Sequence, residues 1–520
     1  MALIPTSNLC LSRFNPKQIM TPTTIHPQQV VSDRTSFHIC CAVSSTTQVS
    51  VSDQPKDGRR SANYQPSIWS YDFLQSLNNV HADVLYKERA AELEQEVRFA
   101  IHDEDVEPVI LLELIDDIQR LGLGHRFKTD IDRALQKSVS SDDACVATQY
   151  SLHAASLRFR LLRQHGYEVS QDIFKAFKDD KGSFKECLYK DVKGMLSLYE
   201  ASHLAFEGED LMEEALEFSR VHLMDLHGVR NWEKGLLEQV IHSLELPLHR
   251  RMLRLEARWY IEAYGRKNAT KHTLLELAKL DFNMVQSTLQ EDLQDMTRWD
   301  VCAGKNLPKC MELCFLALYN SVNEMAYETL RDHGENIIPY LTKAVCGLIC
   351  ANCKSFLQEA KWTRSKHVPT FEDYLENAWM SVSGHAFLVH AYFLQSSNIT
   401  SEALDSLERY HEFLHWLSTI FRLCNDLGTS KDELERGESA NSITCYMKET
   451  GCSEAMSRQH VIDQIDDYWK KMNRFLIDGS PFEKQLLETS INLARISQCK
   501  YQHGDAHGCP DNCLRIEFNR

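Results

Sequence analysis

Apolar side chains recur along most of this chain with the spacing of an α-helix. One stretch alternates steps of three and four residues, which places its apolar side chains on a single stripe. The members of this stripe are Leu275, Ala278, Phe282, Val285 and Leu289. No β-hairpin signature and no fixed-period repeat accompanies the pattern. The pattern therefore predicts an all-α protein, built of two helical domains.

Helix start signals agree with this pattern. Ser480-Pro481-Phe482-Glu483 offers a capping hydroxyl, a proline for the first helical position and an acid at the third. Thr370, after Pro369 and three residues before Asp373, offers a similar cap and acid. We predict that a helix begins at each of these sites.

The first 50 residues differ from the rest of the chain. They are rich in Ser, Thr and Pro, and Asp33 is their one acidic residue. This composition favours an organelle transit peptide over residues 1–55, with a disordered tail as the alternative. We then predict an amino-terminal helical domain over 56–250 and a carboxyl-terminal domain over 251–520, with a loop at 266–272.

Composition narrows the range of partners and substrates that the protein could bind. The 20 glycines and 13 prolines make up about 6% of 520 residues, half of the usual share of about 12%, which again favours long helices. The formal charge of −17 disfavours nucleic acid and anionic membranes as partners. No apolar run is long enough to span a membrane. A diphosphate substrate would need local cations or metal ions to overcome the general repulsion.

One stretch carries side chains suited to a metal ion. Asn425, Thr429 and Glu433 stand at i, i+4 and i+8, so they share one face of a helix. An amide oxygen, a hydroxyl and a carboxylate are hard donors suited to Mg²⁺, and Arg422, one turn earlier, can pair with a diphosphate oxygen. On spacing alone a solvated polar face explains the pattern better.

The sequence of this stretch resembles the second metal-binding motif of plant class I terpene synthases, (N/D)D-x-x-(S/T)-x-x-x-E. Further segments between about residues 59 and 508 carry the same resemblance. They are Arg59-Arg60 with Trp69, Arg160–Gly166, Leu255–Trp259, Phe315–Asn320, Tyr374–Asn377 and Tyr501–Asp505. The paired arginines with the tryptophan are common in the monoterpene-forming branch of that family.

The resemblance implies an amino-terminal α-barrel and a carboxyl-terminal bundle that encloses an apolar pocket. Magnesium, or manganese in its place, would hold the diphosphate of geranyl diphosphate at the mouth of this pocket while the bond to the prenyl group breaks and a monoterpene forms. The implied metal ligands are Asn425, Thr429 and Glu433, and the implied diphosphate contacts are Arg422 and Asn425.

The same resemblance assigns residues that close the site. Arg59 and Arg60 would cap the pocket and assist isomerisation of the substrate, and Tyr501, His503 and Asp505 match a lid loop, with Tyr501 and Asp505 as catalytic candidates. Ser383-Gly384 matches a break in a pocket helix that turns backbone carbonyls toward the cation.

The family's aspartate-rich D-D-x-x-D motif has no counterpart at its expected place. At Arg298-Trp299-Asp300 the sequence looks as if two separate family segments had been joined. Glu291–Asp295 matches the aspartate-rich motif only loosely. We predict an internal deletion near 298–300, an incomplete carboxyl-terminal bundle and impaired activity. The alternatives are a non-catalytic binding or regulatory relative, and a cytosolic sesquiterpene synthase that uses farnesyl diphosphate.

Overall fold

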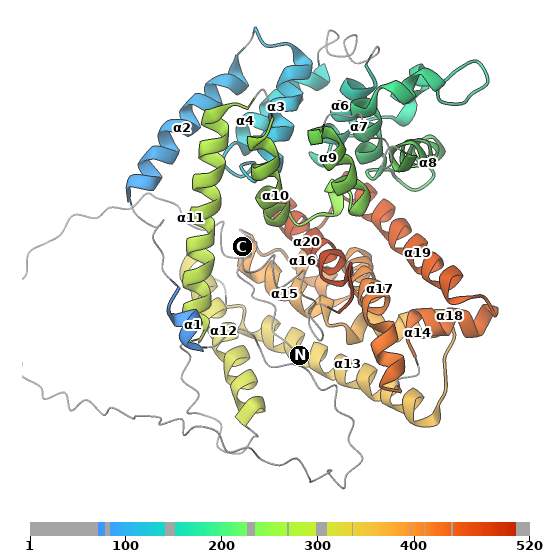
Figure 1. The fold of residues 1–520 in the computed structure, drawn as a ribbon. Helices are drawn as coiled ribbons and strands as arrows, with labels where there is room; N and C mark the ends of the chain where they lie inside the picture. The colour runs from blue at the N-terminus through green and yellow to red at the C-terminus, as the bar shows by residue number, and fades with distance from the viewer. Residues whose placement is uncertain are drawn as a thin grey trace, which may run out of the picture.

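The computed structural model describes residues 71–505 except 78–83, 104, 141–150, 226–233, 268–269, 298–308, 335, 397, 410 and 438–439. In this part of the chain the regular structure consists of α-helices and short 3-10 turns, with one isolated bridge between Lys178 and Phe184 and no strand. The all-α prediction is confirmed (Figure 1). No helix in the described ranges is both long enough and apolar enough to cross a membrane.

The amino-terminal half is a set of mostly short helices around two apolar cores. Its helices are α1 (Tyr71–Gln75), α2 (Val84–His102), α3 (Pro108–Arg120), α4 (Lys128–Ser140), α6 (Leu152–Gln164), η3 (Gln171–Phe177), η4 (Glu186–Lys190), α7 (Val192–Ser202), α8 (Asp210–Asp225), α9 (Lys234–Glu245) and η6 (Leu248–Arg250). One core lies under α6, α7 and α8, and the other under α2, α3, α4 and α6.

Two helices that follow the predicted boundary at 250 share the second of these cores. They are α10 (Leu253–Gly265) and α11 (His272–Thr297), and they contribute Tyr260, Tyr264, Leu274 and Leu277 to it. The predicted loop at 266–272 lies between them, except that its last residue, His272, already belongs to α11. The domain boundary itself stays a prediction.

The predicted helix over the apolar stripe is confirmed, but its inward face lies slightly to one side of that stripe. Leu274, Leu277 and Ala278 are the deeply buried apolar residues, whereas Leu275 and Phe282 are only partly buried. Asp281 continues the buried face because Arg126 and Arg254 pair with its carboxylate at 2.7 and 3.3 Å. Burial opposes ionisation of Asp281, but His125 and Arg126 outweigh it and lower its pKa to about 2.

The carboxyl-terminal half contains the longer helices. They are α12 (Lys309–His333), α13 (Ile338–Ser365), α14 (Phe371–Ser381), α15 (Gly384–Gln395), α16 (Ser401–Glu408), α17 (Glu412–Glu435), α18 (Ser442–Thr450), α19 (Glu454–Phe475) and α20 (Lys484–Tyr501). Helix α17 runs through the middle, with α14, α15, α18, α19 and α20 packed around it.

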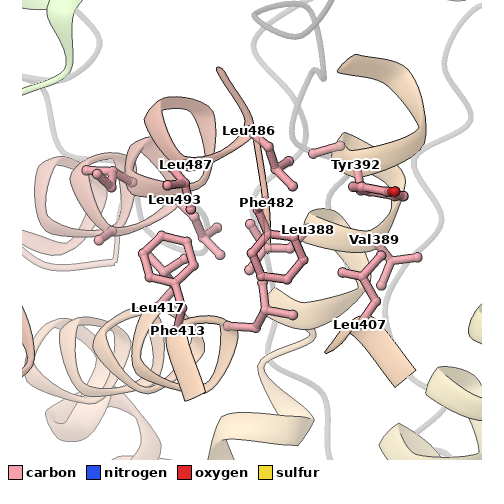
Figure 2. Packing of buried hydrophobic residues seen from close by; sticks show 14 of the residues in the cluster. Leu388, Val389, Tyr392, Leu407, Phe413, Leu417, Phe482, Leu486, Leu487 and Leu493 are labelled. Atoms are coloured by element: carbon pink, nitrogen blue, oxygen red, sulfur yellow. The ribbon is translucent and has the colours of Figure 1, made fainter. Parts of the chain in front are cut away.

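The core around α17 is filled by interlocking apolar side chains. Figure 2 shows Phe413 and Leu417 of α17 facing Leu487 and Leu493 of α20, with Leu388 of α15 alongside. All five are at most 9% exposed. This packing fixes α17, and therefore the face that carries the candidate site.

The two helix starts that the sequence predicted differ in outcome. Thr370 caps α14 as predicted, because its hydroxyl accepts a hydrogen bond from the Asp373 backbone N–H at 3.1 Å. The start at Ser480 is wrong: its hydroxyl accepts from the Phe482 N–H, but α20 begins only at Lys484. The Ser480–Phe482 segment instead forms a turn that lets Phe482 enter the apolar core.

The two halves are joined by buried polar contacts. The Asn473 side chain on α19 binds His249 at 2.8 Å and donates to the His203 and Ala205 carbonyl oxygens at 3.1 Å each. Arg495 on α20 donates to the His249 carbonyl oxygen at 2.9 Å. These contacts place the amino-terminal half against α19 and α20, on the side of the bundle away from α13 (Figure 1).

Candidate metal and diphosphate site

The three predicted metal ligands lie together on α17. The Thr429 hydroxyl is 2.7 Å from Glu433 Oε1 and 2.9 Å from the Asn425 carbonyl oxygen. Thr429 is buried, and Asn425 and Glu433 are only partly exposed. This face is therefore packed against neighbouring elements, which a solvated helix face would not be.

Arg422 lies one turn earlier on α17 and is held by neighbours on two helices. Its guanidinium donates to the Ala378 carbonyl oxygen at 3.1 Å, to Ser381 Oγ at 2.8 Å and to Asn425 Oδ1 at 3.1 Å. Burial would lower its pKa, but neighbouring Tyr374 and Asp426 raise it above the ordinary arginine value. The cation is thus fixed in place beside the first ligand of the motif.

Glu433 is oriented by two neighbours. Thr429 contacts its Oε1 atom, and the Asn441 amide donates to its Oε2 atom at 3.3 Å. Asn441 is also the N-cap of α18 and forms a capping box with Thr444. The start of α18 therefore fixes the last of the three predicted ligands.

The helix break predicted at Ser383-Gly384 is present between α14 and α15. Ser383 has a φ of +65°, in the left-handed region that side chains rarely adopt, and its hydroxyl accepts a hydrogen bond from the Asn352 amide of α13 at 2.8 Å. A Cβ atom on Gly384 would lie 2.7 Å from Ser418 Oγ and 3.2 Å from Ser418 Cα. Glycine thus allows α15 to approach α17 at this point.

The predicted lid residues divide between two places. Tyr501 lies against α17, where a Cβ atom on Gly428 would be 3.0 Å from Tyr501 Cβ and 3.1 Å from the Gly504 carbonyl oxygen. Burial, with the charge of Asp505, raises the pKa of Tyr501 to about 12 despite a hydrogen bond to Asn425. His503 is directed elsewhere and lies 3.5 Å from Glu245 of α9.

Arg59 and Arg60 lie outside the described residues, as does the junction at Arg298–Asp300. Sequence reasoning missed three residues that hold the site. Asn441 donates to Glu433, Ser381 accepts from Arg422, and Glu359 accepts from the Ser381 hydroxyl at 2.5 Å. The N-cap pattern Asn441-Ser-Ile-Thr444, eight residues after Glu433, is the signal that could have found one of them. Ser381 and Glu359 have no local sequence signal, because their contacts depend on how α13, α14 and α17 pack.

A groove of about 1160 Å³ between the two halves lies away from this site. Its lining includes Glu412 and Trp416, near the start of α17. Trp416 and Asn425 are nine residues apart, or about 13 Å along a helix. The two arginines in the groove are already paired, Arg163 with Glu209 and Arg474 with Glu168. We therefore place the candidate site at the motif.

The donor set on α17 fits one magnesium ion. Mg²⁺ takes oxygen ligands, keeps several waters and is usually bound by one or two carboxylates together with substrate phosphates. Asn425, Thr429 and Glu433 supply three such oxygens, with Glu433 as the carboxylate. In the ranges that the structure describes, no cluster of three or more His, Cys, Asp or Glu side chains offers another metal site.

The comparisons with known proteins agree with this geometry. Residues 68–244 match the terpene synthase N-terminal domain, and residues 262–471 match the metal-binding domain of the terpene synthase family. The chain belongs to the terpene synthase family.

Individual relatives cover most of the chain. A probable terpene synthase of Ricinus communis is 49% identical, covering 88% of this chain and 89% of its own length. A chloroplastic tricyclene synthase of Medicago truncatula is 44% identical, covering 88% and 90%. The crystal structure of isoprene synthase from grey poplar (Populus x canescens), with three Mg²⁺ ions and dimethylallyl-S-thiolodiphosphate, matches with a TM-score of 0.74 and 44% identity, covering 86% of this chain and 97% of that one.

Proposed function

We propose that this chain descends from a magnesium-dependent monoterpene synthase that ionises geranyl diphosphate. The observation that carries the proposal is the α17 face on which Asn425, Thr429 and Glu433 lie together beside the fixed cation of Arg422. Magnesium bound there would neutralise the diphosphate as it departs. The family assignment supports this chemistry and leaves the substrate open.

Each residue of the site has a part in this proposal. Glu433, Thr429 and Asn425 supply oxygen atoms to the metal, and Arg422 donates hydrogen bonds to the diphosphate. Tyr501, packed over Gly428, and Asp505, four residues later, would exclude water from the mouth of the pocket. Arg59 and Arg60 add positive charge as the site closes.

We further propose that the chain is impaired by a deletion near Arg298–Asp300. The alignment with the Ricinus relative runs over 532 positions, whereas 88% of 520 residues is about 458, so about 74 positions are occupied in the relative alone. The Medicago alignment, over 533 positions at the same coverage, leaves about 75. Metal ligands on a facing wall would stabilise developing charge by several kcal/mol, and each 1.36 kcal/mol or so is a factor of ten in rate.

The helices that follow the junction support this proposal. Large apolar side chains on α12 and α13 are 41–66% exposed, as expected if helices that once covered them are gone. They are Tyr319, Tyr327, Leu330, Ile338, Tyr340, Phe356 and Leu357. On α17 the one comparable residue is Leu434.

Two other substrates are open to the same site. The poplar structure holds an analogue of dimethylallyl diphosphate, which favours the five-carbon substrate as a second candidate. Farnesyl diphosphate would indicate the sesquiterpene alternative. The chloroplastic relatives and the composition of residues 1–50 support a plastid location, where we place the enzyme.

The test is an assay of volatile products with each of the three prenyl diphosphates and Mg²⁺ or Mn²⁺. We expect traces or nothing from the chain as it stands, and monoterpenes from geranyl diphosphate once the segment of the Ricinus relative is inserted at 298–300. Efficient turnover by the unaltered chain would refute the impairment. A folded chimera that binds the substrates and turns over none of them would favour the non-catalytic alternative.

A further inference from the structure

We infer that Asp426 is a positioning residue that orients Arg422 toward the substrate diphosphate through a buried hydrogen-bond clamp formed with Tyr374 and the start of α18. The inference rests on the proposed function of the α17 face and assigns a role to an acid that does not share the face of the metal ligands. Asp426 follows Asn425 directly, so its side chain leaves the helix about 100° away from that ligand.

The carboxylate of Asp426 is fully enclosed. Its side chain is 0% exposed. The Tyr374 hydroxyl of α14 lies 3.0 and 2.9 Å from the two carboxylate oxygens, and the Ser442 backbone N–H donates to Oδ2 at 2.9 Å. Three elements, α14, α17 and α18, therefore meet at this one side chain.

Arg422 is the one cation near this carboxylate among the contacts described. Its Nη1 atom lies 3.7 Å from Asp426 Oδ1 and 3.1 Å from Asn425 Oδ1. On the other side, its Nη2 atom bonds to Ser381 Oγ, which in turn donates to Glu359 Oε1 at 2.5 Å. The guanidinium is thus held between two acids, Asp426 directly and Glu359 through Ser381.

This arrangement has an energetic reason. A buried guanidinium needs a buried counter-charge, and a carboxylate in the same place needs hydrogen-bond donors for its oxygens. Tyr374 and the Ser442 N–H supply those donors, so Asp426 can stay close to Arg422 without being drawn toward the metal. An arginine held in this way keeps its remaining N–H groups in a fixed direction for a ligand.

The test measures binding of the anion separately from binding of the metal. We would measure two affinities of the full-length chain: Mn²⁺ alone, from the electron paramagnetic resonance of the free ion, and inorganic pyrophosphate at saturating Mg²⁺, by calorimetry. The variants are Asp426→Asn and Tyr374→Phe, with Asp432→Asn as the control on the same helix. Circular dichroism and melting temperature report whether each variant folds.

We expect Asp426→Asn to weaken pyrophosphate binding about tenfold, because hydrogen bonds to charged groups carry effects of this size, while the Mn²⁺ affinity changes less than about twofold. Tyr374→Phe should weaken pyrophosphate binding by a smaller factor, and Asp432→Asn should change neither affinity. A general structural defect would instead weaken Mn²⁺ and pyrophosphate alike, and this result would overturn the inference.

The remaining outcomes are also decisive. Unchanged pyrophosphate affinity in both clamp variants overturns the positioning role and leaves the proposed function intact. If Asp426→Asn does not fold, Tyr374→Phe decides, since it keeps the acid and removes only one donor. An unaltered chain that binds neither probe refutes the proposed function, and the role of Asp426 with it.

Discussion

Two parts of the carboxyl-terminal bundle, helix α17 and the pair α12 and α13, differ sharply in how they are packed. Helix α17 is surrounded by other helices, and its polar residues Arg422, Asp426, Thr429 and Glu433 all have hydrogen-bond partners within the protein. Helices α12 and α13, which follow the junction, expose large apolar side chains at several of the positions whose side chains are described. The comparison teaches that the helix carrying the candidate site can be fully packed while α12 and α13 leave large apolar side chains exposed, because each part of the bundle is stabilised by its own neighbours.

The largest expected effect comes from supplying the segment that we propose is deleted. Insertion of the Ricinus segment at 298–300 should raise turnover of geranyl diphosphate at least about 1000-fold, since several kcal/mol of charge stabilisation would return. Gas chromatography of the products measures this rise. The control is the same insert with its aspartates changed to alanine, and equal activity in the two chimeras would show that packing rather than metal binding was restored.

The next effect tests the candidate metal site on α17 by removing the carboxylate of Glu433. Mg²⁺ with pyrophosphate should stabilise the unaltered chain, by about 2.7 kcal/mol at a ligand concentration 100 times Kd. Glu433→Gln should abolish most of this gain because the metal loses its charged ligand. Thermal melting with and without the ligands measures it. Glu435→Gln, an exposed acid at the end of the same helix, should keep the full gain; equal losses in both would contradict the ligand assignment.

A smaller effect is expected at the contact between α15 and α17. Gly384→Ala should lower the free energy of unfolding by about 1–3 kcal/mol, because the added methyl group would lie 2.7 Å from Ser418 Oγ. Urea denaturation measures the change. Gly235→Ala on α9, where an added Cβ atom would meet no neighbouring atom within 4 Å, should be neutral or slightly stabilising. If Gly384→Ala were as stable as this control, the close approach would not be a constraint.

The smallest effect on stability is expected on the exposed apolar face of α13. Leu357→Lys on α13 should change the free energy of unfolding by less than about 0.5 kcal/mol, since Leu357 is 55% exposed, and it should reduce self-association in light scattering. Leu417→Lys on α17, at 0% exposure, should prevent folding. A severe loss of stability in Leu357→Lys would mean that this face is covered in solution.

The sequence predicted those features that depend on local geometry. The shared face of Asn425, Thr429 and Glu433 follows from helical spacing, and Thr370 caps α14 through a bond within its own turn. Features that depend on distant packing could not be predicted. Asp281 is buried because arginines from α10 and from the α3–α4 connection reach it, and Ser480 fails as a cap because Phe482 enters the core instead.

The same limit applies to the supports of the site. Ser381 holds Arg422 across 41 residues of sequence, and Tyr374 reaches Asp426 across 52. Neither contact has a periodic signature, since each arises where two separately specified helices cross. The candidate ligands can therefore be predicted from the sequence of one helix, while the residues that orient them can be found only in the assembled fold.

The joint between the two halves has a consequence for any attempt to isolate the catalytic half. Asn473 finds its partners in the side chain of His249 and in two carbonyl oxygens at 203 and 205, and Arg495 uses the carbonyl oxygen of His249. A fragment that began after residue 251 would leave the Asn473 amide without these partners, and Arg495 would keep only Asn492 Oδ1 of its two acceptors, at 3.1 Å. The amino-terminal half would then be needed as a permanent scaffold for α19 and α20, even if it supplied no atom to the reaction.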